Sequence, residues 1–462
     1  MNQKTFASLG LPAEQLANLD SLEYRSMTAI QAQSLPHVLQ GRDVIAQAKT
    51  GSGKTAAFGL GLVNRLVVNR FRVQSLVLCP TRELADQVAR ELRRLARYQH
   101  NVKILTLCGG APFGPQLDSL RHGAHIVVGT PGRIEEHLRK GTLNLGEVSC
   151  LVLDEADRML DMGFRESVDA IVSQVPKKRQ TLLFSATYPE SIRSLSGRIM
   201  NRPQMVIAES RHDDRSIRQH FFRFEQNKQR LTMLRLLLHR FRPESTLVFC
   251  NTKRETEEVA DDLRSHGFSA LALHGDLEQR ARDQVLVRFS NRSTSVLVAT
   301  DVAARGLDIE KLDAVINYHI ARDPEVHVHR IGRTGRAGSK GLACTLFSAS
   351  EDYRAERLGE YLGEKIEYET LPAFSLLEKP AFRPPMVTLQ IDGGRKQKVR
   401  PGDILGALTG EEGIAGKQVG KINVFDFFAY VAVERNAAKP ALRKLRSGTL
   451  KGRSFRVRRI SG

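Results

Sequence analysis

Short apolar runs alternate along the chain with longer segments in which apolar and polar residues recur at helical spacing. In the first half the runs are Val44–Ala46, Ser75–Cys79, Ile126–Val128, Leu151–Leu153 and Thr181–Phe184. Strands that alternate with helices predict parallel sheets with helices packed on them. The pattern resumes after about position 217, at Thr246–Cys250, Ser295–Ala299 and Ala314–Asn317. We therefore expect two tandem α/β domains.

A short internal repeat supports this division. Leu76–Glu83 reads LVLCPTRE and Leu247–Glu255 reads LVFCNTKRE, and a helical pattern follows each. Repeated segments indicate repeated structural units, although an echo this short between two buried strands can also arise by chance. The polar segment Ala208–Arg218 is the candidate hinge between the two units.

A third unit is expected after Leu376–Pro385, a linker-like segment with three prolines. Apolar runs and helical patterns then follow in the order βαββαβ, which predicts a small α/β sandwich with one open sheet face and would suit an RNA-recognition motif. The expected strands and helices are Met386–Ile391, Pro401–Leu408, Val419–Val424, Phe428–Val433, Arg435–Leu445 and Phe455–Ile460. The predicted boundaries are 1–208 and 209–370 for the first two domains, 371–385 for the linker and 386–462 for the third domain.

Composition narrows the class of partner. The 462 residues include 41% hydrophobic and 26% charged residues, which is typical of a folded protein, and the net charge of +19 favours a polyanion. Nucleic acid is the first candidate and an anionic membrane surface the second. There is no apolar run of the roughly 18 residues that span a bilayer and no export signal, so we expect a cytoplasmic protein. The five scattered cysteines suggest small buried residues rather than a metal site.

The segment Ala48–Thr55 has the composition of a phosphate-binding loop, and it precedes a helical pattern that extends to Val68. Its glycines let backbone N–H groups approach a triphosphate, while Lys54 can reach the β and γ phosphates and the Thr55 hydroxyl can bind Mg²⁺. A plain glycine turn between a strand and a helix is the alternative, and the first residue departs from the general pattern, which has Gly there. We expect ATP to contact Ala48, Lys49, Thr50, Gly51, Ser52, Gly53, Lys54 and Thr55.

Two carboxylates follow the apolar run Leu151–Leu153. Ligands of open α/β sheets bind at the carboxyl ends of the strands. Asp154 is therefore placed to hold the Mg²⁺ of the nucleotide, and Glu155 to orient and deprotonate the attacking water. An acidic helix N-terminus, which the helix dipole favours, would explain an isolated run of this kind. Because this acidic run occurs in the same chain as a phosphate-binding loop, we favour a catalytic role for the two carboxylates.

The run Asp154–Asp157 reads Asp-Glu-Ala-Asp, and with the phosphate loop it resembles the DEAD-box family of ATP-dependent RNA helicases. The resemblance extends over residues 6–340 and implies two RecA-like domains, with ATP and Mg²⁺ as cofactors and RNA as the partner. Ser185-Ala186-Thr187 resembles the family motif that couples nucleotide state to unwinding, and its hydroxyls are candidates to bond to Asp157. An exposed turn is the competing interpretation of that segment.

The region before the phosphate loop resembles the adenine-binding Q motif of the family. The resemblance implies that an aromatic ring, from Phe6 or Tyr24, stacks on adenine and that Gln31 hydrogen-bonds the edge of the base. Met27 and Glu23 stand where the family usually has Pro and Gly, which bears on the rigidity of the loop. Without this context, Gln31 would be interpreted as a surface residue of a helix.

Other segments resemble the RNA-binding motifs of the family, which grip one strand through its backbone and so bind without sequence preference. In the first domain they contribute Pro80, Thr81, Arg82, Gly109, Gly110, Thr130, Pro131, Gly132 and Arg133. In the second domain they contribute Asn251, Thr252, Gln279, Arg282 and Thr300. Capping turns between strands and helices would explain any one of the loops, and ordinary helix polarity would explain Gln279 and Arg282.

The segment His329–Arg336 carries three arginines at three-residue spacing. By resemblance, Arg333 and Arg336 are arginine fingers that stabilise the charge on the γ-phosphate in the transition state, and Asp308 lies near the ribose. A basic patch that binds nucleic acid is the alternative, and for Arg330 it stays open.

The last 27 residues, Asn436–Gly462, contain nine Lys or Arg and no Asp or Glu. This charge suits RNA phosphates, with a solvated charged face as the alternative. The expected contacts are Lys444, Arg446, Arg456 and Arg458. The aromatic residues near Phe428 depart from the usual RNA-recognition pattern, so both core packing and base stacking stay open for them. A tail of this kind after a short core resembles the bacterial DbpA group, which implies recognition of 23S ribosomal RNA.

The expected function is that of an ATP-dependent RNA helicase whose two RecA-like domains close on ATP and RNA. It would locally unwind structured RNA, with the pre-50S ribosomal particle as the implied partner. No membrane and no obligate protein partner is indicated. The expected catalytic residues are Lys54, Glu155, Arg333 and Arg336. An RNA-binding scaffold or annealing chaperone with a vestigial ATP site, and a DNA-directed P-loop translocase, are the rival functions.

Overall fold

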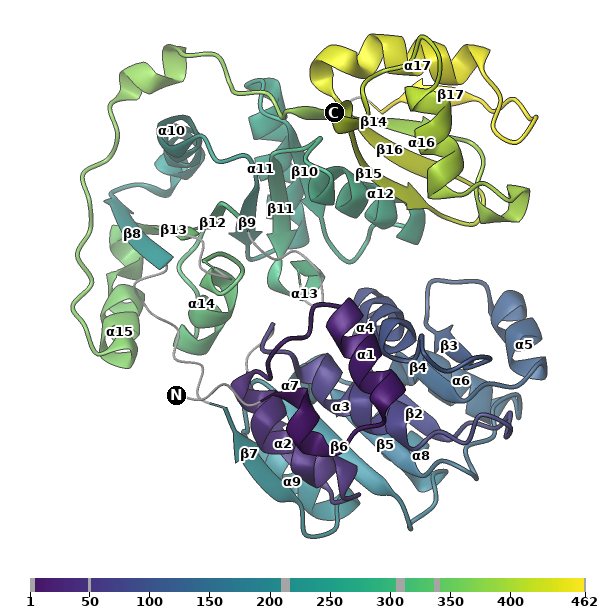
Figure 1. Cartoon of the computed structure of the whole chain (residues 1–462). Coiled ribbons are helices and arrows are strands. Elements are labelled where there is room, and N and C mark those ends of the chain that lie inside the picture. Colours follow the sequence, from purple (N-terminus) through teal and green to yellow (C-terminus); the bar gives the residue numbers. More distant parts are fainter. Residues whose placement is uncertain (1–4, 49–50, 209–216, 305–311, 336–340, 461–462) are drawn as a thin grey trace. The chain divides into compact units, whose positions relative to one another are not determined.

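The computed structural model describes residues 5–48, 51–208, 217–304, 312–335 and 341–460. Contacts divide the chain into two compact units, the first formed by residues up to about position 212 and the second by most of the later residues. The first unit holds one parallel sheet, and the second holds another parallel sheet and a small antiparallel one (Figure 1). No helix in the described ranges is long and apolar enough to cross a membrane.

The first domain is a parallel sheet between two layers of helices. Alternate strand residues enter opposite cores, so that Val44 and Ala46 pack with α1 to α4 while Ile45 packs with α6 to α9. In sheet order the described strands are β3 (Ile104–Leu107), β4 (Ile126–Gly129), β2 (Ser75–Leu78), β5 (Cys150–Asp154), β6 (Gln180–Ser185), β1 (Val44–Gln47) and β7 (Gln204–Ile207). The helices are α1 (Ala13–Ser21), α2 (Ala29–Leu39), α3 (Lys54–Asn64), α4 (Arg82–Leu95), α5 (Phe113–Arg121), α6 (Pro131–Arg139), α7 (Ala156–Asp161), α8 (Arg165–Ser173) and α9 (Glu190–Ile199).

The second domain repeats this architecture. Val248, Val298 and Ile316 pack with α10 and α11 on one face of its sheet. In sheet order the strands are β10 (Ala270–Leu273), β11 (Val296–Thr300), β9 (Thr246–Cys250), β12 (Ala314–Asn317), β13 (Gly341–Ser348) and β8 (Ile217–Phe224), all parallel to their neighbours. The helices are α10 (Arg230–Phe241), α11 (Lys253–Ser265), α12 (Gln279–Ser290), α13 (Asp301–Ala304), α14 (Pro324–Ile331) and α15 (Asp352–Leu362).

The C-terminal domain has the expected order βαββαβ. Its four antiparallel strands lie in the order β15 (Val419–Val424), β16 (Ala429–Glu434), β14 (Met386–Ile391) and β17 (Val457–Arg459). Helices α16 (Pro401–Thr409) and α17 (Ala438–Ser447) cover one face of this sheet and build its core. The two RecA-like parallel sheets followed by a small antiparallel domain confirm the predicted fold class.

Three details differ from the sequence predictions. Helix α3 ends at Asn64 rather than extending to Val68, because the Gln74 side chain binds the backbone N–H and carbonyl of Val67 at 2.9 Å each. The final strand is three residues long, Val457–Arg459. The predicted linker 371–385 is also not a loose connection, since Leu371, Leu376, Leu377, Ala381 and Phe382 pack against the core of the second domain.

All five cysteines are buried and free, as their scattered positions predicted. They stand in or directly beside the strands of the two parallel sheets, where a small apolar side chain suits the core.

Candidate nucleotide and nucleic-acid sites

The phosphate loop joins the end of β1 to the start of α3, as the sequence predicted. Gly51 and Gly53 have φ angles of +80° and +89°, which favour glycine over other residues. Lys54 is buried, and its ammonium donates a hydrogen bond to the Ala48 carbonyl at 2.9 Å. The cation is therefore held inside the loop, where a triphosphate would be cradled. Lys49 and Thr50 lie outside the described residues.

Gln31 fixes the loop from the side. Its amide oxygen accepts the Thr28 N–H at 2.9 Å in a capping box at the start of α2, and its amide nitrogen donates to the Gly53 carbonyl at 3.1 Å. A Cβ atom on Gly53 would lie 2.5 Å from that nitrogen. The residue predicted to bind adenine thus also contacts the loop predicted to bind phosphate.

The aromatic residues of the Q-like segment pack against each other. Phe6 is buried and meets Tyr24 edge-on, with ring centroids 6.0 Å apart, and the Tyr24 hydroxyl donates to Glu91 at 2.6 Å. Glu23 adopts a left-handed conformation with φ +63°, at the position where the family usually has Gly. That conformation costs a residue with a side chain about 1 kcal/mol. The contact of Phe6 or Tyr24 with adenine stays a prediction.

Asp154 and Glu155 lie at the carboxyl end of β5, and each is 3% exposed. Burial raises the pKa of Asp154 to about 7, although the Lys54 ammonium opposes the shift. A second cation would favour the charged form further, so this carboxylate fits a Mg²⁺ site. The described residues contain no cluster of three or more His, Cys, Asp or Glu that could hold a metal. Mg²⁺ would therefore be held by Asp154, the Thr55 hydroxyl and the phosphates of the nucleotide.

The last residue of the DEAD run is bonded to the segment that follows β6. The Asp157 carboxylate accepts the N–H of Ala186 at 3.2 Å and both the N–H and the hydroxyl of Thr187 at 2.9 Å, while its own N–H donates to the Ser185 hydroxyl at 3.3 Å. Strand β6 lies between β1 and β5 in the sheet. The segment Ser185–Thr187 is thus next to both the phosphate loop and the two buried carboxylates.

The three predicted RNA-binding loops of the first domain are joined to one another. Arg82 donates to the Gly110 carbonyl at 3.5 Å, the Gly109 N–H donates to the Thr130 hydroxyl at 3.3 Å, and Arg133 donates to the Ala111 carbonyl at 2.9 Å. A Cβ atom at Gly109 would meet no other protein atom within 4 Å, and the same holds at Gly132. Packing within the protein does not require glycine there, whereas close approach of a ligand backbone would. Pro80 is buried at the end of β2, Thr81 caps α4, and Pro131 is the first residue of α6.

The internal repeat corresponds to the same local structure in both domains. The Thr81 hydroxyl accepts the Leu84 N–H at 3.3 Å at the start of α4, and the Thr252 hydroxyl accepts the Glu255 N–H at 3.1 Å at the start of α11. Each threonine follows a central strand of its sheet, β2 or β9. The repeat is therefore structural, and the capping turn coexists with any contact to RNA.

Of the remaining predicted RNA-binding residues of the second domain, Arg282 and Thr300 are joined through Ala303. Arg282 donates to the Ala303 carbonyl at 2.9 Å, and the Thr300 hydroxyl accepts the Ala303 N–H at 3.3 Å. Gln279 donates to Asp283 at 2.8 Å, one turn further along α12. Asn251 is exposed at the end of β9.

The arginines of the His329–Arg336 segment do not share one environment. Arg330 is 3% exposed, and its guanidinium donates to both carboxylate oxygens of Asp301 at 2.7 Å and to the His319 carbonyl at 3.0 Å. The basic-patch interpretation of Arg330 is therefore wrong, because its guanidinium is paired with Asp301 inside the domain and is not available to nucleic acid. Arg333 is also buried. Arg336 and Asp308 lie outside the described residues.

Sequence-family models cover all three domains. A DEAD/DEAH box helicase model matches residues 28–195, a helicase conserved C-terminal domain model matches residues 228–338, and a DbpA RNA binding domain model matches residues 388–459. The chain is 54% identical over 448 residues to the ATP-dependent RNA helicase DbpA of Escherichia coli, and the match covers 97% of each protein. The chain belongs to the DbpA-like DEAD-box RNA helicases.

Other relatives agree with this assignment. The DEAD-box ATP-dependent RNA helicase CshA of Bacillus cereus is 44% identical over 368 residues, or 80% of this chain and 70% of that protein. A structure of S. cerevisiae Dbp5 bound to RNA and ADP BeF3 is 28% identical and has a TM-score of 0.72, and the match covers 82% of this chain and all of that one. This DEAD-box helicase is thus an RNA-dependent ATPase with a C-terminal RNA-binding domain.

The sheet face of the C-terminal domain that the sequence predicted to be open is partly covered. The Thr388 hydroxyl in β14 is hydrogen-bonded to Asn291 at 2.9 Å and to Ser293 at 2.6 Å, and Arg280 of α12 lies over the Phe428 ring at 5.2 Å. Tyr430 is fully buried on the same face. The second RecA-like domain thus covers the middle of this face through the hydrogen bonds of Thr388, while the buried Tyr430 hydroxyl has no hydrogen-bond partner in the described residues. Sequence reasoning missed these contacts, since each residue looks like an ordinary surface position.

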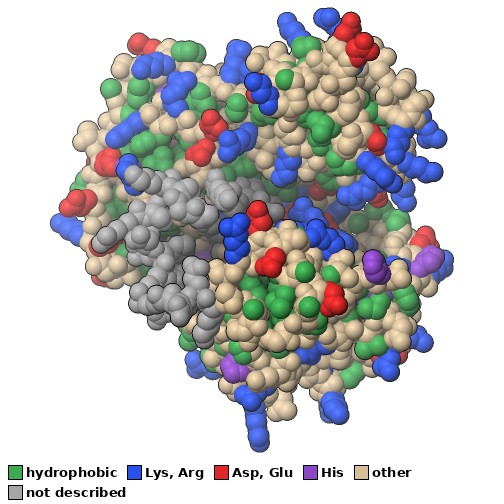
Figure 2. Space-filling view, viewed as in Figure 1, with side chains coloured by type: hydrophobic (Ala, Val, Ile, Leu, Met, Phe, Trp, Pro, Cys, Tyr) green, Lys and Arg blue, Asp and Glu red, His purple; other side chains and the backbone are tan. Residues whose placement is uncertain are grey.

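Basic side chains of the C-terminal domain stay at its surface, and Figure 2 shows Lys and Arg over this domain. Arg456 and Arg458 are exposed on and beside β17. Arg446 reaches from α17 to the Val457 carbonyl at 2.9 Å, and Lys444 donates to the Glu411 carbonyl at 2.5 Å. Arg456 and Arg458 are thus the more available of the four predicted contacts for RNA phosphates.

Proposed function

We propose that this DEAD-box helicase hydrolyses ATP when RNA and ATP together close its two RecA-like domains, and that its target is 23S ribosomal RNA in the assembling large subunit. The observation that supports closure is the division of the candidate catalytic groups. Lys54, Glu155 and Asp154 belong to the first domain, whereas Arg333 and Arg336 belong to the second.

The residues of the chain have separate tasks in this mechanism. Lys54 binds the β and γ phosphates, and Asp154 and Thr55 would hold Mg²⁺, which would supply charge neutralisation at the phosphates. Glu155 orients the attacking water and accepts its proton. Arg333 and Arg336 stabilise the charge on the γ-phosphate in the transition state, so hydrolysis requires the second domain.

The RNA target is inferred from the C-terminal domain. Support comes from the match of residues 388–459 to the DbpA RNA binding domain and from the excess of basic residues in the last part of the chain. The RNA-binding loops of the core contact backbone and carry no sequence information. We therefore assign the selection of the RNA target to the C-terminal domain. We also propose a cytoplasmic location, because five free, buried cysteines suit a reducing compartment.

Three measurements test the proposal. Glu155→Gln should keep ATP binding and lose turnover and unwinding, whereas a scaffold with a vestigial ATP site predicts intact RNA remodelling. ATPase activity of the full chain should be stimulated more by large-subunit ribosomal RNA than by other RNA, and not by DNA; stimulation by DNA would favour the translocase. Residues 1–208 alone should have negligible ATPase activity, and high activity would contradict the role of the second domain.

A further inference from the structure

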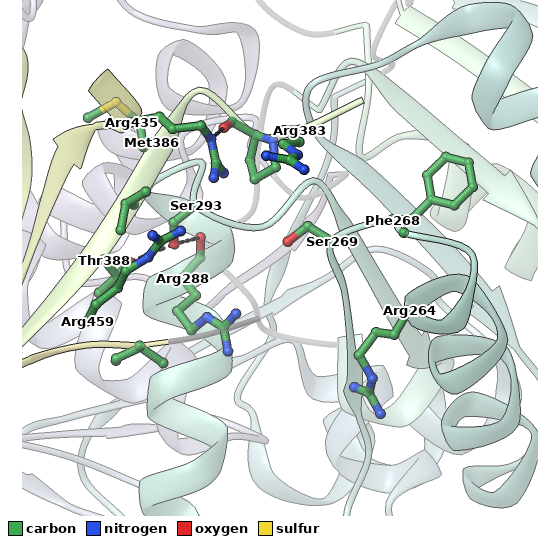
Figure 3. A pocket seen from close by; sticks show the side chains of 14 residues that line it. Arg264, Phe268, Ser269, Arg288, Ser293, Arg383, Met386, Thr388, Arg435 and Arg459 are labelled. Carbon is green, nitrogen blue, oxygen red and sulfur yellow. Dashed lines mark hydrogen bonds between the residues drawn. The ribbon is translucent and has the colours of Figure 1, made fainter. Parts of the chain in front are cut away.

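A pocket of about 310 Å³ lies in the second unit between the second RecA-like domain and the C-terminal domain (Figure 3). We call it the seam pocket. Its walls come from the end of α11, from α12, from the segment before β14, and from β14, β17 and the residue after β16. Its volume corresponds to about ten water molecules at roughly 30 Å³ each, which is enough for a phosphate group with part of its hydration shell.

The wall of the seam pocket carries positive charge and no negative charge. Of its 14 lining residues, five are arginines and none is Asp or Glu: Arg264, Arg288, Arg383, Arg435 and Arg459. Within the described ranges, Arg264 forms an ion pair with Asp261, and the other four form none. Four guanidinium groups without a carboxylate partner therefore surround one cavity.

Arg288 is the most informative of these arginines. It is 7% exposed, and in the described part of the chain its guanidinium makes no side-chain hydrogen bond. Burial, together with the neighbouring Arg264, lowers its pKa to about 10. No carboxylate of the described residues pairs with this largely buried cation, and packing of the aliphatic stem alone would not require an arginine. The position is therefore suited to an anion that is not part of the protein.

The two domains contribute cations from opposite sides of the pocket. Arg264 and Arg288 belong to the second RecA-like domain, whereas Arg435 and Arg459 belong to the C-terminal domain. These charges repel across the seam, and the neutral hydrogen bonds of Thr388 act against the repulsion. An anion between the two sets would convert repulsion into attraction and hold the domains together.

We propose that the seam pocket binds a backbone phosphate of RNA and thereby fixes the C-terminal domain to the second RecA-like domain. One guanidinium group can bind two phosphate oxygens at once, and Arg459 in the pocket wall is exposed, so the pocket is open to solvent. Because the chain is an RNA helicase, a phosphodiester of RNA is favoured over a free ion as the group that enters. The proposal rests on RNA binding by the chain and not on the identity of the RNA.

The test uses the full chain and three variants: Arg459→Gln, Arg288→Gln and the double variant. Arg357→Gln is the matched control, since this exposed arginine of α15 lies outside the pocket wall. The affinity for a labelled structured RNA is measured across salt concentrations. Loss of one phosphate contact should reduce the slope of log K against log salt by about 0.7–0.9. We expect this reduction and a several-fold weaker affinity in Arg459→Gln and the double variant, and wild-type behaviour in the control.

Further measurements test whether each variant is folded and whether the ligand is RNA or free phosphate. Arg459 is exposed, so its replacement does not depend on the core, and thermal unfolding of each variant shows that it is folded. A wild-type slope and affinity in folded Arg459→Gln and in the folded double variant would overturn the proposal. If inorganic phosphate raised the Tm of the wild type but not of the double variant, while the RNA slope stayed unchanged, the ligand would be a free ion and the RNA assignment would be wrong.

ATPase activity, measured with and without RNA, distinguishes the failure of the seam-pocket proposal from the failure of the proposed catalytic mechanism. Basal ATPase activity without RNA should be equal in the wild type, the control and all pocket variants, because no pocket residue belongs to the phosphate loop or the DEAD run. Failure of Glu155→Gln to lose turnover would refute the proposed catalysis and leave the seam pocket unaffected. Equal stimulation of all variants by RNA, at equal affinity, would refute the pocket and leave catalysis unaffected.

Discussion

The bond between Thr187 and Asp157 provides a quantitative test of how the nucleotide site communicates with RNA. Thr187→Val keeps the shape of the side chain and removes the hydroxyl that donates to the Asp157 carboxylate at 2.9 Å. A hydrogen bond to a charged group contributes about 1.5–3 kcal/mol. Thr187 is half-buried and Asp157 keeps two N–H donors, so we expect the lower value, about 1.5 kcal/mol.

The consequence should appear in two measurements on the same protein. The Tm of the first domain should fall by about 3–6 °C, at roughly 2–4 °C per kcal/mol for a domain of this size. Strand separation should fall about tenfold relative to ATP hydrolysis if the whole bond contributes to coupling, since 1.4 kcal/mol corresponds to a factor of about ten. Both are measured with one RNA duplex, by thermal unfolding and by paired ATPase and unwinding assays.

The control is Thr187→Ser, which keeps the hydroxyl and loses a methyl group. It should retain most of the stability and the coupling. If Thr187→Ser behaved like Thr187→Val, the methyl group rather than the bond would be responsible. If Thr187→Val separated strands with wild-type efficiency per ATP while its Tm fell as expected, the bond would be structural and the coupling role would be refuted.

Three further predictions follow from the described contacts. Gly53→Ala should weaken ATP binding in a nucleotide-binding assay, because its φ of +89° disfavours a side chain and its Cβ atom would displace the Gln31 amide, 2.5 Å away. Gly10→Ala, also at positive φ but in open space, should cost about 1 kcal/mol and bind ATP normally. Asp301→Asn should lower the free energy of unfolding in urea by about 3 kcal/mol, since it leaves the buried Arg330 charge uncompensated; weaker RNA binding at unchanged stability would contradict this. Burial would raise the pKa of Glu351, but the nearby His319 ring and hydrogen bonds from Ser348 and Arg230 lower it to about 2. Its contribution to stability is therefore present above pH 4.5 and lost as the pH falls towards 2. Glu351→Gln should therefore be less stable at pH 7 and converge with the wild type in acid, and a difference that is independent of pH would refute the assignment.

Much of the architecture could be predicted because strand, loop and helix follow one another in short, strongly patterned segments. The runs around Val44 and Leu151 are apolar throughout, as expected for strands buried on both faces. The strands that were not singled out include β3 and β7, which lie at the two edges of the first sheet and are partly exposed. Edge strands carry a weaker hydrophobic signal, so the pattern understated the size of the sheet.

The seam between domains could not be predicted from the sequence for a different reason. Thr388 and Gln390 alternate with apolar residues in β14, which is typical of a strand with one solvent face. Both are nevertheless buried. The partners of Thr388, which are Asn291 and Ser293, lie more than 90 positions earlier in the chain. Nothing local distinguishes a polar residue that faces water from one that faces another domain. The buried Arg330 was ambiguous for the same reason.

The strand order of the two parallel sheets has a consequence for stoichiometry. Position by position, β10-β11-β9-β12-β13-β8 corresponds to β3-β4-β2-β5-β6-β1, so β8 takes the place of β1. After β1 the chain forms the phosphate loop, whereas after β8 it continues through Glu225–Gln229 without a glycine and enters α10. In the described residues the second domain thus repeats the strand order of the first without a glycine-containing phosphate loop at the equivalent place. Each chain should therefore carry one ATP per cycle, and any cooperativity in ATP consumption would have to arise between molecules or through RNA.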